Sequence, residues 1–80
     1  MASWTRLLRM KAVINGRLVM AETKQSCYYR YIIFPDDKKS FSIERLPNII
    51  YSGFDYMSGI GAFSAGKSAA KKLKPVNTTP

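Results

Sequence analysis

The 80-residue chain contains no histidine, a single cysteine and only five acidic residues. The missing histidine excludes a Cys/His zinc site and histidine acid–base chemistry. Because Cys27 has no second thiol in the chain, an intramolecular disulfide is excluded, and the lone thiol favours a cytoplasmic or other reducing compartment. Its apolar, aromatic neighbours predict a buried, unreactive thiol. We expect no metal site, no cofactor and no catalytic residues.

A long apolar run is also missing. The best stretch, residues 46–66, contains Pro47, Asn48, Asp55 and four glycines, which makes it too polar for a lipid-facing helix. We therefore expect no transmembrane segment. The chain is 46% hydrophobic and 22% charged, which is typical of a globular protein, and its length allows one thin core. We expect a single small domain over residues 1–74 and a frayed tail over residues 75–80.

Positive charge is abundant by contrast. Thirteen Lys and Arg give a net charge of +8 at pH 7. Six of these cations lie in residues 1–30 beside one acid, and four lie in residues 67–80 with no acid. Nine of the ten aromatic residues lie in the stretch from Tyr28 to Phe63. The pattern predicts a core in the middle, with basic ends that contact nucleic acid, an anionic membrane face or an acidic protein. The alternative is a solvated surface without a partner.

The N-terminal segment has two interpretations. Asn15-Gly16 between two short apolar runs, residues 10–14 and 17–20, favours a hairpin with a type I′ turn. The alternative is a helix over residues 3–14 that ends at Gly16. Residues 1–21 also contain several Arg and no acid, so a mitochondrial targeting segment is a further alternative.

The remaining segments predict the fold class. Residues 26–34 are aromatic and β-branched and indicate a strand. A polar turn over residues 35–39 leads to an alternating strand over residues 40–44, and residues 49–51 suggest a last short strand. Residues 52–66 hold too many glycines for a regular helix, whereas residues 65–74 indicate one. We expect an α+β fold: a small antiparallel sheet of three or four strands, with an N-terminal hairpin and one C-terminal basic helix.

The tyrosines of the 26–34 strand divide between its two faces. Alternation places Tyr29 and Tyr31 on one face and Tyr28 with Arg30 on the other. One face must be core. The other either joins the core or stacks on nucleic-acid bases.

Residues 61–68, GAFSAGKS, match the pattern G-x-x-x-x-G-K-[ST] and so resemble the Walker A phosphate loop. The resemblance implies a glycine-rich loop before a helix, in which Gly61, Gly66, Lys67 and Ser68 hold phosphate. Only 12 residues follow Ser68 and none is acidic, so the metal-binding carboxylate of a nucleotidase is missing there. We expect no nucleotide hydrolysis. An anion-binding loop without catalysis and a chance match both stay open.

These observations predict a small, non-enzymatic, basic binding module that contacts nucleic-acid phosphates with low sequence specificity. The alternative is an interaction protein, an accessory subunit or inhibitor that docks on an acidic surface of a larger assembly. The candidate nucleic-acid- or anion-binding residues are Arg6, Arg9, Lys11, Arg17, Arg30, Gly61, Gly66, Lys67, Ser68, Lys71 and Lys74.

Overall fold

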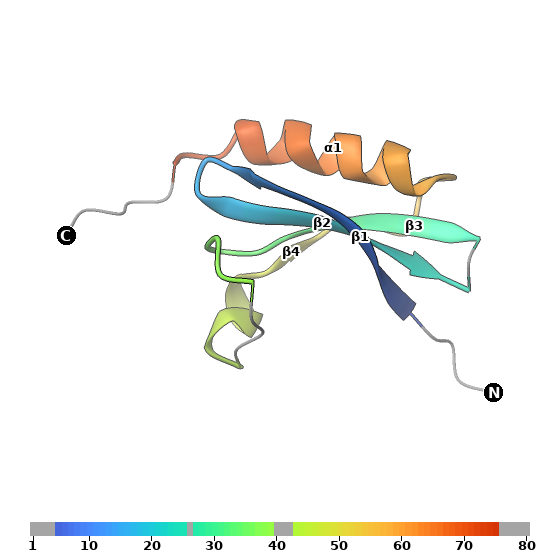
Figure 1. The fold of residues 1–80 in the computed structure, drawn as a ribbon, viewed down its shortest axis with the longest axis horizontal. Coiled ribbons are helices and arrows are strands. Elements are labelled where there is room, and N and C mark those ends of the chain that lie inside the picture. Colours follow the sequence, from blue (N-terminus) through green and yellow to red (C-terminus); the bar gives the residue numbers. More distant parts are fainter. Residues whose placement is uncertain (1–4, 26, 40–42, 76–80) are drawn as a thin grey trace.

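A computed structural model describes residues 5–25, 27–39 and 43–75 and shows one antiparallel sheet with a helix across one of its faces (Figure 1). The strands follow the order β1-β2-β3-β4, so each pairs with its neighbour in sequence. The elements are β1 (Thr5–Ile14), β2 (Arg17–Lys24), β3 (Tyr28–Ile33), a 3-10 helix η1 (Ile43–Asn48), β4 (Ile50–Tyr51) and α1 (Gly59–Lys71). The expected α+β class, with four strands and a C-terminal helix, is confirmed.

The N-terminal hairpin is present. Asn15 and Gly16 have φ angles of 53° and 79°, and both values lie in the left-handed region that a type I′ turn requires. The strand interpretation is therefore correct, and the helical alternative is wrong over residues 5–14. The strand extends further than expected because β2 runs to Lys24 and offers pairing partners as far as Thr5.

Alternation along the strands gives the sheet two different faces. Ala12, Val19 and Ile33 form one cross-strand row, and Val19 and Ile33 pack against Ala70 of α1. Lys11, Met20, Ile32 and Tyr51 form the neighbouring row on the opposite face. We call the first the helix face and the second the far face. A smaller core of Leu18, Ile32 and Phe34, joined by Met20 and Ile49, lies on the far face.

Helix α1 begins six residues earlier than the sequence predicts, and the glycines explain why. A Cβ atom at Gly66 would lie 2.6 Å from Cβ of Tyr31 and 2.9 Å from Cγ1 of Val19. A Cβ at Gly59 would lie 2.5 Å from Cδ1 of Leu8. These glycines therefore let the helix approach the sheet closely. This packing outweighs their low helix propensity, so the expectation of a non-helical segment up to residue 66 is wrong over residues 59–66.

Both ends of α1 are capped by side chains. The Ser58 hydroxyl accepts a hydrogen bond from the backbone N–H of Gly61, at 3.0 Å. At the other end, Nδ2 of Asn15 donates to the carbonyls of Ala70, Lys71 and Leu73, at 3.2, 3.3 and 3.2 Å. The hairpin turn thus satisfies carbonyls that would lack partners at the end of a helix. The helix ends at Lys71, so the expected extension to residue 74 is wrong.

The connection between β3 and β4 differs from the expected strand over residues 40–44. Ile43 and Glu44 belong to η1, and residues 40–42 lie outside the described part of the chain. Arg45 of η1 packs over the ring of Phe34 and pairs with Asp36, which draws this segment over the far face rather than alongside β3. The last short strand is confirmed at Ile50–Tyr51. Of the expected frayed tail, only Pro75 is described.

Candidate nucleic-acid interface

Strand β1 is irregular at the centre of its length. Its pairing with β2 is interrupted between Leu7 and Lys11, where the register shifts. Such a bulge bends a strand and redirects its side chains. A hollow of about 320 Å³ lies here, lined by Arg6, Leu7, Leu8 and Arg9. We call it the bulge hollow. Both arginines are exposed, so their guanidinium groups are free to meet a ligand from solvent.

A second hollow of about 130 Å³ lies on the far face, and Leu7 lines both. We call it the far-face pocket. Its apolar lining comes from Leu7, Leu18, Met20 and Phe34, and its charged lining comes from Lys11, Lys38, Lys39 and Arg45. All four charged residues are cations. Since Leu7 lines both hollows, the two adjoin each other along β1.

Asp36 positions Arg45 and the backbone of Lys38 at the far-face pocket. Its carboxylate accepts a hydrogen bond from the backbone N–H of Lys38, at 2.9 Å, and its Oδ1 lies 3.0 Å from Nη2 of Arg45. Its own carbonyl accepts from the N–H of Leu18, at 2.9 Å, which fixes the turn to β2. The sequence analysis assigned Lys38 and Lys39 to a polar turn and selected neither them nor Arg45 as binding residues. The signal was the Asp two residues before a Lys, a spacing that closes an Asx turn.

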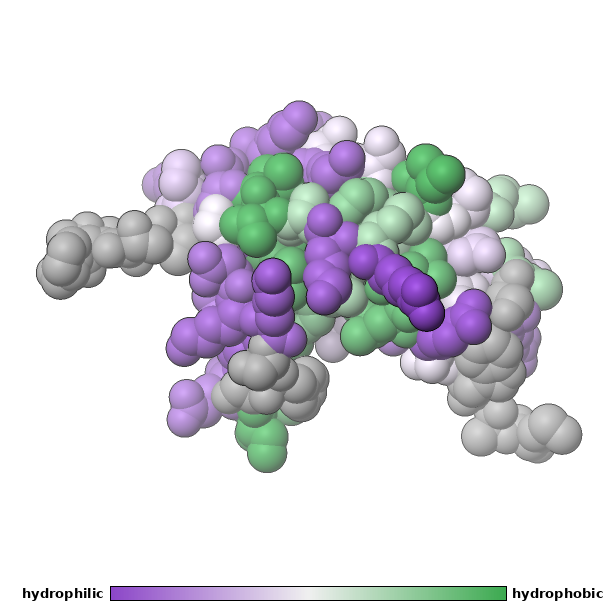
Figure 2. Space-filling view, in the orientation of Figure 1, coloured by the Kyte–Doolittle hydropathy of each residue, from purple (hydrophilic) through white to green (hydrophobic). Residues whose placement is uncertain are grey.

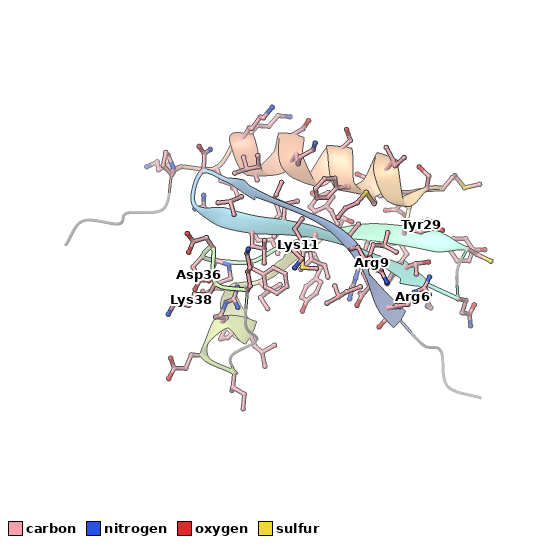
Figure 3. The ribbon with its side chains drawn as sticks, viewed as in Figure 1. Arg6, Arg9, Lys11, Tyr29, Asp36 and Lys38 are labelled. Atoms are coloured by element: carbon pink, nitrogen blue, oxygen red, sulfur yellow. The ribbon has the colours of Figure 1, made fainter. Side chains whose placement is uncertain are left out.

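The N-terminal candidates gather along β1. Figure 3 shows Arg6, Arg9 and Lys11 following this strand, with Lys38 beside Asp36 on the turn below the sheet, and Figure 2 shows hydrophilic surface over the same region. We call Arg6, Arg9, Lys11, Lys38, Lys39 and Arg45 the β1 basic groove. Only Asp36 and Asp37 accompany them on the turn, and Asp36 already faces Arg45. The groove therefore carries excess positive charge.

Arg30 is engaged within the protein. Its guanidinium pairs with Glu22 on the neighbouring strand and lies 4.3 Å from the ring centroid of Tyr51 and 4.5 Å from that of Phe54. These contacts hold the Arg30 guanidinium between two aromatic rings. They also neutralise the carboxylate of Glu22, which pairs with Leu7 across the strands. Arg30 thus supports the far face rather than reaching outward from it.

The C-terminal candidates lie on the other side of the molecule. Lys67 and Lys71 belong to α1, which covers the helix face, and Lys74 follows the helix. Nζ of Lys67 lies 4.9 Å from the ring centroid of Phe63. Arg17 joins this group, because its guanidinium donates to the carbonyl of Lys74. The structure therefore places Arg17, Lys67, Lys71 and Lys74 on the helix side of the sheet and Arg9, Lys11 and Arg30 on the far side, while Arg6 shares a face with Thr23.

The segment GAFSAGKS lies entirely within α1. A phosphate loop needs backbone N–H groups turned inward before the helix starts, whereas these residues have helical backbone conformation. The glycine-rich loop that the resemblance implies at Gly61 to Ser68 is therefore not formed, because these residues are helical. Gly66 is buried against the sheet, Ser68 is exposed, and Gly61 lies in the first turn. Close packing against the sheet therefore accounts for Gly66, the glycine that the phosphate-loop pattern would assign to phosphate binding.

The tyrosines divide as the alternation predicts. Tyr31 packs beneath α1, while Tyr28 is 51% exposed at the start of β3. Cys27 is exposed in the turn before β3, so the expected buried thiol is wrong. The reason is that β3 starts at Tyr28, two residues later than expected, and Cys27 thereby lies outside the sheet.

In the described ranges, no helix is long and apolar enough to cross a membrane. The same residues bring together no cluster of three or more metal-ligating side chains of the Cys, Asp and Glu types. Comparison with protein-family models, with curated proteins and with solved structures finds no match to this chain.

Proposed function

We propose that this protein is a non-enzymatic binding module that contacts nucleic-acid phosphates through the β1 basic groove. The observation that carries the proposal is the convergence of cations from three separate segments, namely β1, the turn after β3 and η1, around two hollows that Leu7 lines in common. These segments are far apart in the sequence, yet all of them contribute positive charge around the two hollows. This convergence distinguishes the groove from a scattered basic surface.

Phosphate contact is the chemistry that such a groove suits best. Exposed Lys and Arg side chains displace the counterions condensed on nucleic acid, and that release drives association. Such contacts position a protein on the backbone but carry little sequence information. We therefore expect low sequence specificity and an affinity that falls steeply between about 50 and 200 mM salt.

The test is a salt titration of binding, followed by fluorescence anisotropy with labelled DNA and RNA. The groove variant replaces Arg9, Lys11, Lys38 and Lys39 with Gln. We expect its plot of log affinity against log salt to lose about one unit of slope for each phosphate contact removed. All four side chains are exposed, so the fold should be retained.

A control variant with the same loss of charge separates local contact from net charge. It replaces Lys67, Lys71, Lys72 and Lys74 with Gln, on or just beyond α1. We expect it to keep most of the affinity, with a slope closer to wild type. If the control loses more affinity than the groove variant, the site lies on the helix. If wild type binds no nucleic acid at about 50 mM salt, the proposal is wrong.

A second candidate function rests on the position of β1 in the sheet. It is the first strand in the order β1-β2-β3-β4, so within the described chain its outer edge pairs with no strand. An acidic segment of another protein could add there as a further strand, held by backbone hydrogen bonds and by Arg6 and Arg9. The same titration discriminates the two functions, because this one predicts binding to acidic peptides and none to nucleic acid.

A further inference from the structure

The far-face pocket has a lining that suits one kind of occupant. Its apolar floor is held by the far-face core, in which Leu18 and Phe34 are buried. Its volume is about 130 Å³. For comparison, an apolar cavity of about 150 Å³ accommodates one benzene ring. The pocket is therefore of the size for a single six-membered ring or one branched side chain.

The polar side chains around this floor are all hydrogen-bond donors. Lys11, Lys38 and Lys39 carry ammonium groups, and Arg45 carries a guanidinium. None of these side chains can accept a hydrogen bond. A ring with carbonyl oxygens on its edge would match them, whereas a ring with an exocyclic amino group would bury a donor against donors. An unsatisfied buried donor reduces affinity substantially.

One donor, the guanidinium of Arg45, and the backbone that carries another, Lys38, are held before any ligand arrives. Arg45 lies with its guanidinium 4.9 Å from the ring centroid of Phe34 and is paired with Asp36. The same carboxylate fixes the backbone of Lys38. Side chains that are already held lose less conformational freedom on binding, so this part of the pocket is preorganised.

We propose that the far-face pocket binds one unstacked thymine or uracil base of a single strand, with the flanking phosphates on the β1 basic groove. The inference rests on the proposed nucleic-acid function and adds the class of base and strand. At ring position 4, thymine and uracil present a carbonyl oxygen, which accepts, where cytosine presents an amino group, which donates. Because thymine and uracil also carry an N3–H donor, the base enters the pocket by its position-4 edge. A base inside a duplex is stacked and paired, so only a single strand can place its ring in the pocket.

The experiment compares oligo(dT), oligo(dC) and duplex DNA of equal length by anisotropy at one salt concentration. We expect wild type to bind oligo(dT) about tenfold more tightly than oligo(dC), since one unmet donor costs on the order of a factor of ten. Abasic substitution at the bound positions should remove this preference while leaving the phosphate-led affinity.

Two matched variants locate the effect. Leu7 and Val13 lie on the far face of β1 and are 48% and 50% exposed, but only Leu7 lines the pocket. We expect Leu7→Gln to reduce the preference for oligo(dT) to about twofold or less, and Val13→Gln to retain it. Because both side chains are half exposed, both variants should fold, which a thermal melt checks.

Each other outcome is informative. Equal binding of oligo(dT) and oligo(dC) by wild type overturns the base pocket and leaves the phosphate groove standing. Absence of binding to all three nucleic acids overturns the proposed function itself. Binding of an acidic, leucine-containing peptide that is weakened by Leu7→Gln and not by Val13→Gln, without binding of oligo(dT), would overturn the base pocket in favour of protein docking.

Discussion

The two faces of the sheet are built by different physical means. The helix face is closed by contact between small residues, with Ala62, Gly66 and Ala70 of α1 fully buried. The far face has only a small apolar core, and charged side chains surround it. Close packing tolerates almost no change of volume, while a solvated charged surface tolerates many substitutions. Stability should therefore depend on the helix face, and binding on the far face.

The largest expected effect breaks the close contact on the helix face. Gly66→Val would place methyl groups where Tyr31 and Val19 already lie, and we expect it to lower the free energy of unfolding by about 3 kcal/mol, at the upper end of the usual range for an overpacked core. Gly61→Ala is the control, because a Cβ there meets only the Ser58 hydroxyl, at 3.0 Å. Urea denaturation measures both variants. Equal stabilities would show that α1 does not need its close approach.

The next effect concerns the far face, where a charge pair supports the surface. Arg30→Gln leaves the Glu22 carboxylate without its partner, and we expect a loss of roughly 1–2 kcal/mol in unfolding free energy. It should also weaken nucleic-acid binding, since the carboxylate then opposes the groove. Adding Glu22→Gln should restore most of both losses. A double variant that is as weak as the single one would mean that Arg30 contacts the ligand directly.

A smaller effect tests the link between hairpin and helix. Asn15→Ala removes a side chain that caps α1 and places a Cβ residue without a polar group in the left-handed region, so we expect a loss of about 1–2 kcal/mol. Asn15→Gly keeps the turn but loses the cap. If Asn15→Gly is as stable as wild type in a thermal melt, the hydrogen bonds to α1 contribute nothing.

The smallest expected effect concerns the resemblance to a phosphate loop. Because residues 61–68 are helical, millimolar phosphate at matched ionic strength should leave the melting temperatures of wild type and Lys67→Ala equally unchanged. We also expect no ATP or GTP hydrolysis, with or without Mg²⁺. A phosphate stabilisation seen only in wild type would show that Lys67 forms an anion site on the helix. ATP turnover abolished in Lys67→Ala would show that the chain is an enzyme.

Local signals in the sequence were sufficient for part of the fold. The Asn15-Gly16 turn and the alternation of Tyr29 and Tyr31 each depend on a few adjacent residues, and both predictions were right. The start of α1 could not be predicted in this way. Gly59 and Gly66 stabilise the helix because they let it pack closely against Leu8, Tyr31 and Val19. These three residues are distant from the glycines in the sequence.

The same distinction applies to the candidate site. Arg6, Arg9 and Lys11 were found because they are close together in the sequence. Lys38, Lys39 and Arg45 complete the groove only after the chain folds back across the far face. There the Asp36 carboxylate pairs with Arg45 and accepts a hydrogen bond from the backbone N–H of Lys38. A net charge calculated for each segment hides these three cations, because neighbouring acids cancel them. Only the fold shows that they lie close to Lys11.

The glycines of α1 also constrain the order of folding. A 13-residue helix with three glycines is too weak to persist alone, because nucleation is costly and each glycine adds about 1 kcal/mol. The β1–β2–β3 meander has local pairings and provides the surface on which α1 can form. We therefore expect the transition state for folding to contain the meander while the helix is still unformed, so that substitutions in α1 change the unfolding rate more than the folding rate.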